Sequence, residues 1–158
     1  MTKKKLYKLI SILLCILWMG IVFVLSHEPA NDSSETSGNV IRWILKVFEP
    51  NEDEDVLIKH IEFLQPIVRK LAHFTLYMIG GILIYNFVSI YVIEKSKILS
   101  SLCGCFYAVT DEIHQLYVAG RSGELRDVAI DTAGVVTGIA IFSYILYLLK
   151  RRRFDGGK

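Results

Sequence analysis

The residues most able to carry chemistry are concentrated in one stretch, "TDEIHQLYVAGRSGELRDVAID", at residues 110–131. Carboxylates and imidazoles can serve as general bases, and arginine binds phosphate through paired hydrogen bonds. The candidates in this stretch include carboxylates, an amide and two arginines: Asp111, Glu112, Asp127, Asp131, Gln115, Arg121 and Arg126. It therefore indicates a charged binding or catalytic site.

The rest of the chain is too apolar for an ordinary soluble domain. Its 158 residues are 53% hydrophobic, and the mean hydropathy is +0.42. Apolar residues form four long blocks, at about residues 6–25, 68–93, 98–118 and 127–149. A membrane-spanning helix needs about 20 apolar residues. The sequence therefore predicts an all-α fold, a polytopic membrane bundle of four transmembrane helices in a single domain over residues 1–158.

Charge is distributed by segment and predicts the orientation of the bundle. The N-terminus, the turn "EKSK" and the tail "KRRR" are rich in basic residues, whereas residues 26–67 are mainly acidic. Because basic loops stay on the cytoplasmic side, both termini are expected in the cytoplasm of a multi-pass cell-membrane protein. Residues 26–67 and the loop 119–127 are then extracellular. Basic flanks of this kind are usual in membrane proteins, so nucleic acid is not an expected partner.

The extracellular segment is expected to contain helices of its own. Apolar residues recur at helical spacing in "SSETSGNVIRWILKVFEP", which predicts an amphipathic helix lying on the outer leaflet of the cell membrane. A second short helix is predicted from about residue 53 to residue 64, ending before Pro66, because proline disrupts helix interiors.

With this topology, the unusual polar residues converge at the outer ends of three spans. Lys70, His73 and Tyr77 share one helical face, as do Asp111 and Gln115. Asp127 and Asp131 continue into Gly134 and Gly138, whose small size lets helices approach closely. The charged faces are therefore expected to pack inward against one another. The structural alternative is a salt-bridge network that only holds the bundle together.

The residue types leave several functions open. An enzyme acting on a lipid headgroup would use catalytic candidates among His73, Asp111, Glu112, Asp127 and Asp131. Its headgroup-binding residues would be Lys70, Tyr77, Gln115, Arg121 and Arg126. The same cluster could bind a headgroup without catalysis, and a third alternative is ion movement. The sequence does not decide whether the protein is an enzyme.

A metal site is a further alternative, since His73, Asp111, Glu112 and His114 offer nitrogen and oxygen ligands. The sequence contains no HExxH motif or equivalent, and such mixtures are often plain ion pairs. We therefore expect no metal and no cofactor.

Three stretches resemble the VanZ-like family of bacterial membrane proteins: "RKLAHFTLYMIGGIL", "TDEIHQLYVAGRSGELRDVAIDTAGVVTG" and, more loosely, "FVLSHEPANDSSETS". The resemblance covers nearly the whole chain. The matching positions are Lys70, His73, Tyr77, Asp111, Glu112, Gln115, Arg121, Asp127, Asp131 and Gly134. Ala119 stands where the family often has proline, and "LSHEP" replaces a Ser-Ser-Gln-like run, so no role is assigned to Ser26 or His27.

The resemblance implies a contribution to glycopeptide or lipoglycopeptide resistance, of the teicoplanin type. The expected topology places the charged site that would serve it in the outer leaflet. The expected partners are membrane lipids, a lipid-linked cell-wall precursor or the lipoglycopeptide antibiotic itself. The alternative is a membrane-embedded hydrolase or transferase acting on a lipid or lipid-linked phosphate headgroup.

Overall fold

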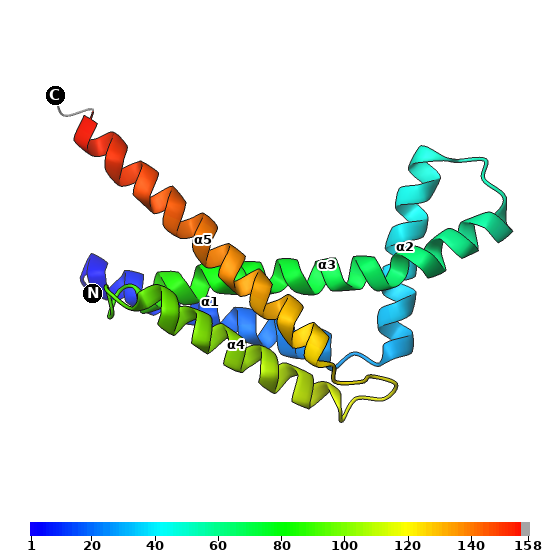
Figure 1. Cartoon of the computed structure of the whole chain (residues 1–158), viewed down its shortest axis with the longest axis horizontal. Helices are drawn as coiled ribbons and strands as arrows, with labels where there is room; N and C mark the ends of the chain where they lie inside the picture. Colours follow the sequence, from blue (N-terminus) through cyan, green and yellow to red (C-terminus); the bar gives the residue numbers. More distant parts are fainter. Residues whose placement is uncertain (156–158) are drawn as a thin grey trace.

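The computed structural model describes residues 1–155, and this part of the chain forms five α-helices (Figure 1). They are α1 (Lys3–Ser26), α2 (Ala30–Phe48), α3 (Glu54–Val88), α4 (Ser96–Gln115) and α5 (Leu125–Asp155). The helices α1, α3 and α4 run alongside one another in alternating directions, α5 packs obliquely across α3, and α2 crosses one end of this bundle (Figure 1). The predicted all-α fold is confirmed.

The bundle buries polar side chains and exposes apolar ones, the reverse of a water-soluble domain. The buried polar residues are Ser11, Ser26, Ser96, Ser100, Asp111, Glu112, Gln115 and Asp131. Large apolar side chains such as Leu17, Val24, Leu102 and Phe106 face outward and are 60% to 72% exposed. Charged residues are rarely fully buried, and contiguous exposed apolar surface marks contact with a partner or a membrane. This surface therefore suits contact with lipid.

Three helices in the described part of the chain are long and apolar enough to cross a membrane: α1, α3 and α5, the last over Leu125–Arg152. The fourth, α4, has a comparable length of 20 residues, or about 30 Å. It is less apolar because it ends in the polar sequence "DEIHQ". The count of four spanning helices stays a prediction.

Small residues bring the backbones of α3 and α5 into direct contact. A Cβ atom added to Gly138 would lie 2.0 Å from the backbone oxygen of Met78. One added to Gly134 would lie 2.4 Å from the backbone oxygen of Phe74. The close packing expected from the spacing of these glycines is therefore confirmed.

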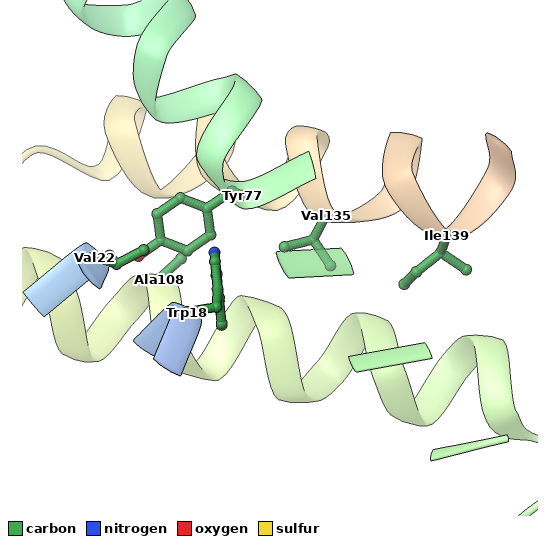
Figure 2. Close-up of a cluster of buried hydrophobic side chains, with 6 residues drawn as sticks. All are labelled: Trp18, Val22, Tyr77, Ala108, Val135 and Ile139. Atoms are coloured by element: carbon green, nitrogen blue, oxygen red, sulfur yellow. The ribbon is translucent and has the colours of Figure 1, made fainter. Parts of the chain in front are cut away.

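An apolar core joins the four bundle helices (Figure 2). It is formed by Trp18, Val22, Tyr77, Ala108, Val135 and Ile139. The rings of Trp18 and Tyr77 meet edge to face, with centroids 5.7 Å apart. The indole nitrogen of Trp18 donates a hydrogen bond to the Leu76 carbonyl at 2.9 Å. The polar atoms of the core are thus bonded, as burial requires.

The prediction that a short helix ends before Pro66 is wrong, because α3 continues through this residue. Packing against α2 supports this part of α3: Gln65 donates a hydrogen bond to the Ser34 carbonyl, and Arg42 pairs with Glu54. The first part of α3 projects beyond α2 at an angle to the rest (Figure 1). A bend of this kind is the usual consequence of proline within a helix.

The basic segments lie toward one end of the bundle. The N-terminus, the α3–α4 turn and the C-terminal end of α5 point the same way (Figure 1). The α1–α2 and α4–α5 connections lie at the opposite end and are joined by a backbone hydrogen bond from Ala30 N to Ala119 O, 3.1 Å long. The charged motif is therefore held at the end that α2 crosses.

Replacing Gly138 with alanine should lower the melting temperature of the purified protein in detergent by at least about 3 °C, because overpacking costs about 1–3 kcal/mol. The matched control is Gly20→Ala, since a Cβ atom at Gly20 would have no neighbour within 4 Å. This control should melt at the same temperature or higher. Equal melting temperatures for Gly138→Ala and the unchanged protein would contradict the α3–α5 contact.

Candidate functional site

Asp111 lies at the centre of the site, on the buried face of α4. One of its carboxylate oxygens, Oδ2, accepts hydrogen bonds from the hydroxyls of Ser26 and Tyr77, at 2.9 Å and 3.0 Å. The donors come from α1 and α3, so this carboxylate joins three helices. All three side chains are buried, and Tyr77 connects the site to the apolar core below it.

His73 of α3 faces Asp131 of α5 beside this centre. The His73 Nδ1 atom lies 3.7 Å from an Asp131 carboxylate oxygen, and the Asp131 side chain is 0% exposed. Neither Asp131 oxygen has a hydrogen-bond partner among the residues that the structure describes. The ion pair is therefore looser than a hydrogen-bonded one, and a fully buried carboxylate lacks the donors that burial normally demands.

A second ion pair lies nearer the surface, between Lys70 and Asp127. The lysine Nζ atom is 3.1 Å from Asp127 Oδ1, and both side chains are about one-quarter exposed. This pair again links α3 to α5. The pair agrees with the predicted helical faces: Lys70 lies about one turn from His73 on α3, and Asp127 lies about one turn from Asp131 on α5.

Glu112 fixes the loop that follows α4. Its carboxylate accepts a hydrogen bond from the backbone N–H of Glu124 at 3.0 Å and one from the Gln115 side chain at 3.3 Å. This hydrogen bond between the buried Glu112 carboxylate and the Glu124 backbone fixes the position of the α4–α5 loop relative to α4.

Arg121 joins the α4–α5 loop to the end of α1. Its Nε atom donates a hydrogen bond to the Glu28 carbonyl at 3.0 Å, and its terminal nitrogen donates to Leu25 at 3.4 Å. Gly120 precedes it with a φ of 74°, a conformation that favours glycine. Burial lowers the pKa of the Arg121 guanidinium, but arginine stays charged in proteins. No carboxylate in the described residues lies within ion-pair distance of Arg121.

These residues surround a small polar cavity of about 50 Å³. Its volume suits one or two water molecules or a small anionic group. The lining includes Arg69, Lys70, His73, Gln115, Gly120, Arg121, Ser122, Glu124, Asp127, Ile130 and Asp131. Three cations therefore face one small space.

A larger and mainly apolar cavity, of about 290 Å³, adjoins the polar one between α1, α2 and α3. Its apolar lining includes Leu25, Val40, Val68, Ala72 and Leu76. Arg69, His73 and Arg121 line both cavities. The combined space is polar at one end and apolar at the other, which is the polarity of a lipid.

Most of the residues predicted for the site lie together. Lys70, His73, Gln115, Arg121, Asp127 and Asp131 line the polar cavity, and Asp111 and Tyr77 lie in hydrogen-bond contact beneath it. Glu112 borders a neighbouring apolar cavity instead. Arg126 is exposed and lines neither the polar nor the larger apolar cavity. The structure therefore does not bring Arg126 to the others.

Sequence reasoning missed two residues of the site. Ser26 is 1% exposed and bonds to Asp111, although the departure of "LSHEP" from the family pattern left it without a role. Its place at the outer end of an apolar block was the available signal. Arg69 lines both cavities, and its signal was its position beside Lys70 in "RKLAH".

Side chains from three bundle helices thus form a charged site, set among outward-facing apolar surfaces, which defines a helical membrane protein. The family described as VanZ/LLP1 matches residues 11–149. The chain therefore belongs to the VanZ/LLP1 family, as the sequence motifs predict. Comparisons with curated proteins and with solved structures gave no match.

Proposed function

We propose that the protein contributes to glycopeptide and lipoglycopeptide resistance of the teicoplanin type by binding a phosphate-bearing lipid headgroup in the outer leaflet. The ligand would be a membrane lipid or a lipid-linked cell-wall precursor. The observation that carries this proposal is the adjoining pair of cavities, one polar and one apolar, which share Arg69, His73 and Arg121.

The phosphate would lie at the polar cavity. Arg69, Lys70 and Arg121 line it, and arginine suits phosphate because its planar fork donates two parallel hydrogen bonds. Lys70 is already paired with Asp127, so the arginines would carry most of the recognition. The acyl or isoprenoid chain would occupy the apolar cavity, where burial of its methylene groups stabilises the complex by about 0.8 kcal/mol each.

The outer-leaflet placement rests on four membrane crossings, with both termini in the cytoplasm. The fourth crossing is α4, whose Leu102 and Phe106 face outward while Gly104 and Ala108 pack inward. Three basic segments lie toward one end of the bundle, and basic segments remain cytoplasmic. The charged site, at the other end, would then lie at the level of the outer headgroups.

The second candidate is a membrane-embedded hydrolase or transferase acting on the same headgroup. The contact between His73 and Asp131 favours it, because a carboxylate beside an imidazole can orient a general base. Binding and catalysis would use the same cavity. A chemical change in the bound lipid would distinguish catalysis from binding alone.

Native mass spectrometry of the purified protein should show retention of phosphatidylglycerol but not of diacylglycerol, which lacks the phosphate. Arg121→Ala should weaken this retention by about 10–100-fold, because hydrogen bonds to charged groups contribute about 1.5–3 kcal/mol. Arg42→Ala, which alters an arginine outside both cavities, should bind normally. Equal retention of both lipids would contradict phosphate recognition.

A mass change in any lipid of a membrane extract, lost in His73→Gln, would instead establish catalysis.

Cells that express Glu112→Gln or Arg121→Ala should lose protection against teicoplanin, whereas Arg42→Ala should keep it. Glu112 and Arg121 hold the loop that borders the polar cavity, so either change should open the site. The measurement is the inhibitory concentration of the drug, with membrane insertion verified by fractionation. If both variants insert normally and still protect, the site has no part in resistance.

A further inference from the structure

Three side chains from three different helices converge within the site. His73 of α3, Asp111 of α4 and Asp131 of α5 each offer one ligand atom, and these atoms lie within 4.8 Å of one another. Imidazole nitrogen and carboxylate oxygen together form a donor set that suits first-row divalent metals. Ligand atoms about 2.0–2.2 Å from a shared Zn²⁺ lie roughly 3–4 Å apart. A small contraction would therefore complete the set.

The burial of Asp131 without hydrogen-bond donors among the described residues is an independent observation that favours a cation at this position. Its side chain is 0% exposed, and neither carboxylate oxygen accepts a hydrogen bond from the residues that the structure describes. A buried carboxylate without donors is costly, and buried charges are normally paired or bound to metals. The nearest cationic group, on His73, lies at 3.7 Å.

Among the described residues, no lysine or arginine forms an ion pair with the carboxylates of Asp111 and Asp131. Lys70 pairs with Asp127, and Arg121 donates its hydrogen bonds to backbone carbonyls. Asp111 receives hydroxyl donors, which are neutral, on one oxygen only. Asp111 and Asp131 thus place two acidic groups against a single imidazole inside the bundle. A dication would balance this charge.

We propose that His73, Asp111 and Asp131 bind a divalent transition-metal ion such as Zn²⁺ or Mn²⁺. The polar cavity of about 50 Å³ beside His73 and Asp131 leaves room for water to complete the coordination. The ion would join α3, α4 and α5 at one point. This inference goes beyond headgroup binding and does not depend on it, and it departs from the sequence-based expectation of no metal.

The test uses the full chain, purified in detergent with a tag that contains no histidine and then stripped with a chelator. Isothermal titration with Zn²⁺ and with Mn²⁺, followed by elemental analysis, should give about one ion per chain for at least one of them. Asp131→Asn and His73→Gln should each lower the affinity by at least about 100-fold, since loss of a residue that only hydrogen-bonds a metal ligand already costs about 10–100-fold. Helicity and monodispersity would verify that the variants fold.

Two controls distinguish this site from other sources of binding. Asp55→Asn makes the same chemical change at an exposed position of α3 that lines neither cavity, and should bind normally. His27→Gln should also bind normally, because His27 is exposed, contacts His114 and Phe23, and lines neither cavity. The proposal is overturned if the unchanged protein binds neither ion, if His27→Gln abolishes binding, or if Mg²⁺ and Ca²⁺ bind as tightly as Zn²⁺ and Mn²⁺.

Discussion

The burial of Asp111 and Asp131 between helices is the constraint on which the site depends. Each carboxylate occupies a position where solvation by water is lost, so its charge must be met by groups from neighbouring helices. Asp111 meets this demand through hydroxyls of α1 and α3, whereas Asp131 has only the loose contact with His73. The difference makes Asp111 a structural junction and leaves Asp131 available to a ligand.

Close helix packing makes these contacts possible. Glycines at the α3–α5 contact bring the two backbones together, so short side chains such as Asp131 can reach across. Dispersion and hydrogen bonding, more than the hydrophobic effect, drive helix association in lipid. The glycines therefore set a short distance between α3 and α5. The charged side chains at the end of the bundle meet across this short distance.

Much of this structure could be predicted from the helical spacing and the charge distribution in the sequence. The shared face of Lys70 and His73 on α3, and that of Asp127 and Asp131 on α5, follow from spacings of three and four residues, whereas the pairing between the two helices is seen only in the structure. The continuous α3 could not be predicted, because the packing of α2 that supports the helix around Pro66 joins residues far apart in the sequence. For the same reason, the particular bond of Ser26 to an aspartate in another helix could not be predicted, although its place at the end of an apolar block was a signal. Arg126, close to the site in sequence, points elsewhere because α5 begins at Leu125 and turns it to the exposed face.

The most direct test of the central claim, that polar side chains from different helices meet inside the bundle, is disulfide trapping in intact membranes. Cys15, Cys103 and Cys105 are free thiols and would first be replaced by alanine. Ser26→Cys combined with Asp111→Cys should then cross-link rapidly on mild oxidation, since the two native side chains are hydrogen-bonded. Ser26→Cys with Ile113→Cys, on the exposed face of α4, should not. Absence of the first cross-link, or equal formation of both, would contradict the inward-facing site.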